Sequence, residues 1–488
     1  MHLRVDALRR LFDEKNYTVE GVLGRIGQAG QDGLGRNSTV PAATALGKDL
    51  DPLAALIRLF LLQESLSLAS AGKALDLDLL DSLQLVHTRG GSVSARVDVR
   101  PYESPDDGAS GYLVSDLTPG LDHATPQTKP DYVLGASPAS LTLTQLTVRD
   151  HASKALDLGT GCGVQALHLA RHCDEVIATD LNPRALKLAR LSAALSEIQL
   201  ELRRGSLYEP VAGEAFDLIV SNPPYVISPP EGKRLTYREG SHSGDSLTEA
   251  VVRQAADHLR PGGTAQFLSN WAITANQSWQ DRLRGWIEKT GLDCWAIERE
   301  RMDPFEYIEL WLTDAGLAGT AGWRPAYERW LSYFDQLGIE AIGMGWLHLS
   351  AAGRDQPSWR FEAWPHSVEQ PVGAVFAKNR SAIDAADLPL GELLQARLQL
   401  TDVQQETIGE PGAADPQHII LRQRRGLLRA IRVGTVEAAV LGTMDGTLTL
   451  AQVIPAAAEV LGVDQTQLAA QVTPVVRDAL RDQFLQLC

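Results

Sequence analysis

Cysteine is scarce in this chain of 488 residues, which contains only four and no Cys-x-x-Cys pair. Their spacing fits neither a disulfide scaffold nor a structural zinc site, so we expect a reducing compartment, the cytoplasm. The most apolar early run, 53–62, is short and contains Arg58. A membrane span needs about 20 apolar residues, so the sequence predicts a buried helix there and no membrane association. The cysteines are Cys162, Cys173, Cys294 and Cys488.

Positive charge is also in short supply. The chain has 45 Lys and Arg against 61 Asp and Glu, for a net charge of −16. Strong non-specific binding to nucleic acid requires a positive field, so any such binding must use a local patch. The length and the hydrophobic fraction of 44% are typical of a globular protein with two to four domains.

Residues 1–125 are predicted to form an N-terminal accessory domain of helices followed by a β-ribbon. Thr18 is placed to cap a helix over 19–26. After a Gly-Gly turn, apolar residues alternate from Val93 to Val99, which indicates a strand with one buried face. This order of elements fits a winged-helix-like module and a helical cap over the next domain equally well.

Residues 131–350 alternate short apolar runs with helix-length segments, which predicts βαβ units and an α/β fold with helices on both faces of a parallel sheet. Leu134–Ser140, just before the first strand, could form a lid over a pocket or an ordinary surface loop. The predicted strands lie at 154–158, 175–179, 216–220, 264–268, 293–298 and 341–349.

Residues 355–488 are predicted to form a C-terminal accessory domain. A hairpin over 418–433 is followed by helices beginning near Thr435, Thr449 and Gln465, an order that again fits a winged-helix-like fold. The hairpin carries the densest basic cluster of the chain, which could grip phosphates or form a solvated face offset by nearby acids. The cluster consists of Arg422, Arg424, Arg425, Arg429 and Arg432.

A glycine-rich turn follows the first strand of the central region. The strand ends at Asp157, and glycines follow at alternate positions, Gly159, Gly161 and Gly163. Glycine lets the backbone pass close to a ligand or adopt torsions closed to other residues. The spacing is GxGxG rather than the GxGxxG of dinucleotide sites, which favours S-adenosylmethionine (SAM) over NAD and disfavours an NAD oxidoreductase.

The next strand ends in a second acid, Asp180, which lies 17 residues after Gly163. A carboxylate at this point suits a ribose with two free hydroxyls. Asn182 follows as the cap of the next helix. The candidate cofactor-binding residues are Asp157, Gly159, Thr160, Gly161, Gly163, Asp180, Leu181, Asn182, Ser206 and Leu207.

The strand over 216–220 leads into Asn222, Pro223, Pro224 and Tyr225, the candidate catalytic residues. Ligands of an open parallel sheet sit at the carboxyl ends of its strands, so this tetrapeptide lies on the cofactor's side. The prolines fix the backbone, the Pro223 carbonyl and the Asn222 amide oxygen supply two acceptors, and Tyr225 supplies an aromatic face. Such a site suits a planar substrate with an NH2 group. It requires no metal, and no metal-ligand spacing stands out.

These two motifs resemble those of class I SAM-dependent methyltransferases with an NPPY motif. The group includes release-factor glutamine, ribosomal RNA guanine-N2 and DNA adenine N-methyltransferases. The resemblance covers about residues 131–350 and implies a Rossmann-like seven-stranded methyltransferase sheet. It also implies that the glycine turn with Asp157 holds the methionine part of SAM, that Asp180 binds the ribose, and that Asn222 with Pro223 holds the acceptor nitrogen.

One position departs from the family's pattern. In the loop after the third strand, Ser206 stands where the family usually has an acid. A hydroxyl can accept from the adenine amino group, but without charge assistance.

The sequence therefore predicts a SAM-dependent N-methyltransferase acting on a macromolecule, either RNA or a translation protein, because two flanking modules suggest docking. The possible winged-helix flanks, the arginine cluster and Lys233, Arg234 and Arg238 favour nucleic acid, and we expect an RNA base as acceptor. The acidic charge and the loop at 240–249, which resembles the glutamine-modifying branch, favour a protein glutamine instead. The alternative outside enzymes is a non-catalytic regulator built on the SAM fold.

Overall fold

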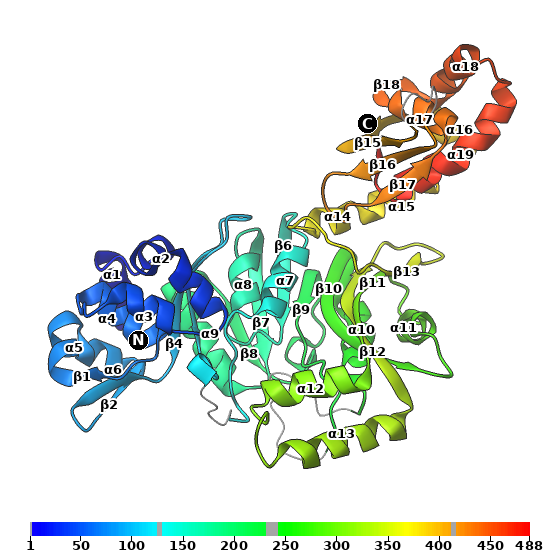
Figure 1. Cartoon of the computed structure of the whole chain (residues 1–488). Coiled ribbons are helices and arrows are strands. Elements are labelled where there is room, and N and C mark those ends of the chain that lie inside the picture. Colours follow the sequence, from blue (N-terminus) through cyan, green and yellow to red (C-terminus); the bar gives the residue numbers. More distant parts are fainter. Residues whose placement is uncertain (1, 124–128, 231–242, 411–415) are drawn as a thin grey trace. The chain divides into compact units, whose positions relative to one another are not determined.

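The computed structural model describes residues 2–123, 129–230, 243–410 and 416–488 (Figure 1). The chain divides into two compact units. The first comprises Met1–Thr144 and His151–Trp364, and the second comprises Gln145–Asp150 and Pro365–Cys488. Lys233, Arg234 and Arg238 lie outside the described residues. None of the helices in the described ranges combines the length and apolarity that a membrane span requires.

The first unit begins with a mainly helical module, residues 2–123, which we call the N-terminal module. Thr18 caps α2 as predicted, since its hydroxyl accepts the Gly21 N–H over 3.0 Å. The module contains α1 (His2–Glu14), α2 (Val19–Gly35), α3 (Val40–Leu46), α4 (Pro52–Leu56), a π-helical turn (Ile57–Leu61), β1 (Leu66–Ser67), α5 (Leu68–Ala74), α6 (Leu77–Ser82), β2 (Val86–Arg89), β3 (Ser92–Ala95), β4 (Asp98–Glu103), β5 (Ser110–Ser115) and a 3-10 turn (Leu121–His123).

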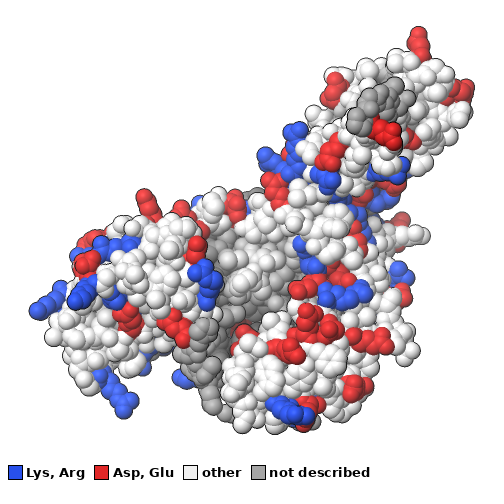
Figure 2. All heavy atoms as spheres, in the orientation of Figure 1, with Lys and Arg blue, Asp and Glu red and all other residues white. Residues whose placement is uncertain are grey.

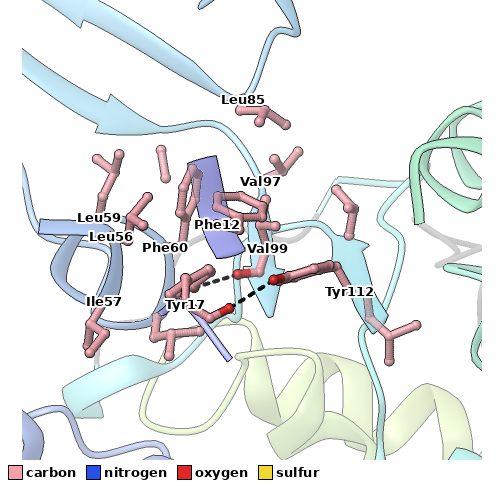
Figure 3. Close-up of a cluster of buried hydrophobic side chains, with 14 of the residues drawn as sticks. Phe12, Tyr17, Leu56, Ile57, Leu59, Phe60, Leu85, Val97, Val99 and Tyr112 are labelled. Carbon is pink, nitrogen blue, oxygen red and sulfur yellow. Dashed lines mark hydrogen bonds between the residues drawn. The ribbon is translucent and has the colours of Figure 1, made fainter. Parts of the chain in front are cut away.

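The predicted alternation from Val93 to Val99 is confirmed as a buried face, but the run is divided between two strands. β3 pairs antiparallel with β1 and β2, whereas β4 pairs with β5. Aromatic and aliphatic side chains together form the core next to these strands (Figure 3). There the Tyr17 hydroxyl donates to the Val99 carbonyl over 2.6 Å, and the Tyr112 hydroxyl donates to the Tyr17 carbonyl over 3.1 Å. These bonds join the helices to the β4–β5 ribbon.

The central sheet has eight strands in the order β13-β11-β12-β10-β9-β6-β7-β8. All neighbouring pairs are parallel except the two that β12 makes with β10 and β11. The strands are β6 (Ala152–Leu158), β7 (Cys173–Asp180), β8 (Glu201–Arg204), β9 (Phe216–Ser221), β10 (Leu259–Thr274), β11 (Asp293–Met302), β12 (Ile339–Ser350) and β13 (Trp359–Ala363). The Rossmann-like α/β prediction is confirmed, with β13 as an additional edge strand beyond residue 350.

Helices cover both sides of this sheet (Figure 1). α8 (Val164–Leu169) and α9 (Pro183–Leu195) contribute apolar residues to the core of the N-terminal module. α10 (Ser246–His258) and α11 (Trp279–Ile287) pack with the sheet in a second core. α7 (Pro138–Leu146) precedes β6. α12 (Pro304–Asp314) and α13 (Trp323–Leu337) form an aromatic helix pair between β11 and β12, which we call the helical insertion.

The second unit contains the predicted hairpin, β16 (His418–Gln423) with β17 (Ala430–Val433), which is antiparallel as expected. β15 (Val403–Ile408) extends it to three strands. The predicted helices are present as α17 (Thr435–Gly442), α18 (Leu450–Leu461) and α19 (Gln465–Arg481), and Thr449 forms a capping box with Gln452. The remaining elements are α14 (Gly373–Ala377), α15 (Asn379–Ala386), α16 (Leu390–Gln395), β14 (Arg397–Leu400), β18 (Asp445–Thr449) and β19 (Leu485–Leu487).

Candidate active site

A cavity of about 370 Å³ opens at the carboxyl ends of β6, β7 and β9. This volume is within the range of small-molecule sites. Asp157, Gly163 and Tyr225 do not line it. The other sequence-predicted site residues do: Gly159, Thr160, Gly161, Asp180, Leu181, Asn182, Ser206, Leu207, Asn222, Pro223 and Pro224.

The glycine turn after β6 presents backbone rather than side chains to the cavity. Gly159 and Gly161 have φ of +80° and +56°, torsions that residues with a Cβ rarely adopt. A Cβ added at either position would meet nothing within 4 Å, so the space in front of the turn is open. The turn is held by the neighbouring strand β7, because the Gly159 and Thr160 N–H groups both donate to the Thr179 carbonyl over 2.9 Å. The turn is therefore shaped to receive a ligand closely.

Asp157 supports the turn from below. Its carboxylate is 1% exposed and accepts the Thr160 hydroxyl over 2.6 Å and the Ala166 N–H over 3.1 Å. Burial raises the pKa of Asp157 to about 7, and the nearby Asp180 charge adds to the rise. Asp157 thus fixes the turn and the start of α8.

Asp180 lies at the end of β7 with its carboxylate beside the glycine turn. One oxygen accepts the Gly161 N–H over 2.9 Å and the other accepts the Asn182 N–H over 2.8 Å. Burial raises the pKa of this carboxyl. Leu181, which follows, is 54% exposed and lines the cavity. A carboxylate next to an exposed apolar side chain suits a ribose joined to a flat base.

Ser206 and Leu207, in the short loop after β8, also line the cavity. Leu207 has φ of +48°. The Ser206 N–H donates to the Glu209 carboxylate over 3.3 Å.

Asn222 stands at the end of β9, and its amide oxygen is buried without a hydrogen-bond partner among the described residues. A buried acceptor left without a donor costs about 1–3 kcal/mol, so this oxygen is available to a donor from a ligand. The preceding residue is held firmly, because the Ser221 hydroxyl donates to the Leu158 carbonyl over 2.6 Å. The start of the tetrapeptide therefore follows directly on a residue that lies beside the end of β6, where the glycine turn begins.

Tyr225 lies away from the cavity and packs with the helical insertion. Burial raises the pKa of its hydroxyl to about 12. Two residues on, the Ile227 N–H donates to the Tyr307 hydroxyl over 3.0 Å, and the same oxygen accepts from the Asn270 side chain over 2.9 Å. The insertion thus fixes the backbone that follows the two prolines.

Sequence reasoning missed part of the cavity wall. Leu247 and Val251 on α10 line it, and so do Tyr132 and Val133. The predicted lid, 134–140, contains the lining residues Leu134, Gly135 and Ser140. No local signal marks α10, because its two lining residues are ordinary members of an apolar helix face.

Two of the five arginines of the cluster in the second unit form ion pairs. Arg422 pairs with Glu406 at 2.8 Å, and Arg425 pairs with Asp402 at 3.1 Å. Arg429 is buried. In Figure 2 basic and acidic side chains are interspersed over the described part of the visible face. These contacts fit the solvated-face interpretation better than a phosphate grip.

Comparison with known proteins identifies the central region. Residues 137–288 match the family model "Methyltransferase small domain". This chain therefore carries a class I SAM-dependent methyltransferase domain of the N-methyltransferase group, with SAM as cofactor. A second family model, "Domain of unknown function (DUF7059)", matches residues 14–96 of the N-terminal module.

Among curated proteins, the chain is 35% identical over 161 residues to a release factor glutamine methyltransferase of Geobacter sulfurreducens. It is 40% identical over 158 residues to a protein of the same description from Deinococcus radiodurans. Each match covers 30% of this chain and about half of the relative, 54% and 56%. A methyltransferase structure from Pyrococcus furiosus aligns with a TM-score of 0.26 and 19% identity, over 43% of this chain and 80% of that one.

Proposed function

We propose that this protein transfers a methyl group from SAM to the side-chain amide nitrogen of a glutamine in another protein. The observation that carries the proposal is the buried, unpartnered amide oxygen of Asn222 in the cavity. A primary amide is planar and offers two N–H donors on one nitrogen. Asn222 Oδ1 and the Pro223 carbonyl would accept one hydrogen each and thereby fix the direction of the nitrogen lone pair.

The chemical groups that line the cofactor half of the cavity fit the parts of SAM. The open backbone at Gly159 and Gly161 would receive the amino-acid part, and the Asp180 carboxylate would take the ribose hydroxyls. Leu181 and Leu207 offer apolar surface to the adenine, and Ser206 offers a neutral acceptor to its amino group. When bound, SAM supplies an electrophilic methyl group. The chain's own contribution is then mainly proximity and orientation of the acceptor.

A protein acceptor replaces the RNA base that the sequence favoured. The curated relatives are named for glutamine methylation of release factors. Of the arginines that suggested phosphate contacts, Arg422 and Arg425 pair with Glu406 and Asp402 and Arg429 is buried, whereas Arg424 and Arg432 are exposed. A polyanion also requires a positive field, and this chain carries a net charge of −16.

The test is methyl transfer from labelled SAM to purified release factors of the same organism, followed by mass mapping of peptides. We expect one added methyl group on a single glutamine. The matched control is the Asn222→Ala variant, which should bind SAM and leave the release factor unlabelled. Label that appears in RNA but not in protein would overturn the proposal.

A further inference from the structure

The N-terminal module is joined to the methyltransferase domain along a regular seam between β5 and α9. The Tyr112 N–H donates to the Ser196 hydroxyl and the Val114 N–H donates to the Ser192 hydroxyl, each over 2.9 Å. Residues four apart lie on one face of a helix, so the two serines provide acceptors for alternate residues of the strand. β5 therefore uses α9 in place of a neighbouring strand on this edge.

The fit along the seam is close. A Cβ added at Gly111, at the start of β5, would lie 2.1 Å from the Ser196 hydroxyl oxygen. Such a separation is impossible without movement of the strand or the helix. The strand consequently has a fixed position relative to α9, and its carboxyl end has a fixed position relative to the start of that helix.

That carboxyl end reaches the cofactor cavity through Asp116. Its carboxylate accepts the Arg184 Nε–H at 3.0 and 2.9 Å and the Val133 N–H at 2.9 Å. In return, the Asp116 N–H donates to the Val133 carbonyl over 3.0 Å. The pKa of Arg184 is raised, mainly by its hydrogen bond to this carboxylate.

Val133 belongs to the segment Tyr132–Gly135, which lines the cavity and lies outside any helix or strand. A Cβ at Gly135 would come within 3.0 Å of the Ser115 hydroxyl oxygen, so this segment also packs directly against the end of β5. On its other side, the Asn182 side chain donates to the Asp131 carbonyl over 2.9 Å. The wall is therefore held between β5 and the start of α9.

We propose that Asp116 is a positioning residue for SAM, and that the N-terminal module is thereby an integral part of the cofactor site. An irregular segment loses conformational entropy when it is ordered, by about 1–2 kcal/mol per residue. Asp116 orders the segment before SAM binds. Binding then costs less conformational entropy, so the affinity for SAM is higher. This inference rests on SAM binding alone and is independent of the methyl acceptor.

The test is calorimetric titration of the full chain with SAM. Asp116→Ala should raise the Kd for SAM about tenfold. The matched control is Ser192→Ala, which removes one bond of the same seam away from the wall and should change the Kd by less than about twofold. Asp116→Asn should fall between them, since it keeps an oxygen for the Val133 N–H but loses the charge opposite Arg184.

Thermal unfolding of each variant separates positioning from general stability. A positioning role predicts that Asp116→Ala and Ser192→Ala have similar midpoints and different Kd values. An unchanged Kd in Asp116→Ala would overturn the proposal. Equal weakening in both variants would also overturn it, because the effect would then belong to the seam as a whole.

Discussion

The Thr160 hydroxyl donates a 2.6 Å hydrogen bond to the buried carboxylate of Asp157, and the same carboxylate oxygen accepts the Ala166 N–H. A single acid thus joins the glycine turn to the first turn of α8. Burial raises its pKa from 3.8 to about 7, so at mildly acidic pH the folded, ligand-free protein keeps a proton that the unfolded chain loses.

This difference predicts how stability depends on pH. The pKa of Asp157 is 3.8 in the unfolded chain and about 7 in the folded protein. Between these two pH values the folded state binds more protons than the unfolded state, so the free energy of unfolding falls as the pH rises. The loss from this one group is at most about 4 kcal/mol. Asp157→Asn keeps an oxygen for both bonds and has no proton to lose. Urea unfolding at about pH 5 and about pH 8 should therefore show a flatter profile for the variant; parallel profiles would contradict the prediction.

Asn222→Ala should reduce methyl transfer strongly while SAM binding persists. The variant removes the unpartnered acceptor and leaves the glycine turn and Asp180 intact. Loss of one preorganised hydrogen-bonding group in an active site reduces kcat by about 10²–10³. Asn222→Asp is the informative companion, because it retains oxygen acceptors of the same shape. Transfer rates and SAM titrations on both variants check the role. Undiminished transfer by the alanine variant would exclude it.

Asp180→Ala should weaken SAM binding about tenfold to a hundredfold, because hydrogen bonds to a charged group contribute about 1.5–3 kcal/mol. Asp174→Ala is the matched control. Asp174 lies near the start of the same strand, is largely exposed and pairs with His151 at the surface. Calorimetry on the two variants separates a ribose contact from a general effect of removing charge. Equal Kd values would exclude Asp180 from the cofactor site.

Tyr307→Phe should affect the acceptor side of the cavity and not the cofactor side. The substitution leaves the Ile227 N–H and the Asn270 side chain without their common acceptor. We expect a loss of about 1–3 kcal/mol in the free energy of unfolding and a higher KM for the acceptor, with the Kd for SAM unchanged. Tyr327→Phe is the control on the same helix pair, since Tyr327 contacts only the side chain of Glu309 at the surface among the hydrogen bonds described. A raised Kd for SAM would contradict this division of roles.

Local patterns allowed the prediction of those parts of the molecule that are built from neighbouring residues. The glycine turn and the end of β9 follow buried strands directly, so the apolar runs and the residues after them placed both correctly. Tyr307 is 80 residues from Ile227, and Asp116, which accepts the Val133 N–H, is 17 residues from Val133. Contacts of this kind depend on tertiary packing and have no local signature.

The sequence pattern predicted that the sheet ends at residue 350, whereas β13 adds an edge strand at Trp359–Ala363. The reason is again a contact that depends on tertiary packing. β13 alternates Trp359 and Phe361, which pack on the second core, with Arg360 and Glu362. All five of its residues remain partly accessible, as expected of an edge strand. The prediction placed these residues in the C-terminal accessory domain, 355–488, although the backbone of β13 pairs with β11 along its full length.

β13 has a practical consequence for anyone who divides this chain. A fragment cut at residue 350, where the sequence pattern of alternating strands and helices stops, would lose the partner of β11 and expose a row of free backbone donors and acceptors. An unpaired edge strand is a template for backbone pairing with another molecule, so we expect the truncated protein to self-associate. Cloning boundaries for the catalytic unit belong after Trp364, with the preceding tryptophan and phenylalanine retained.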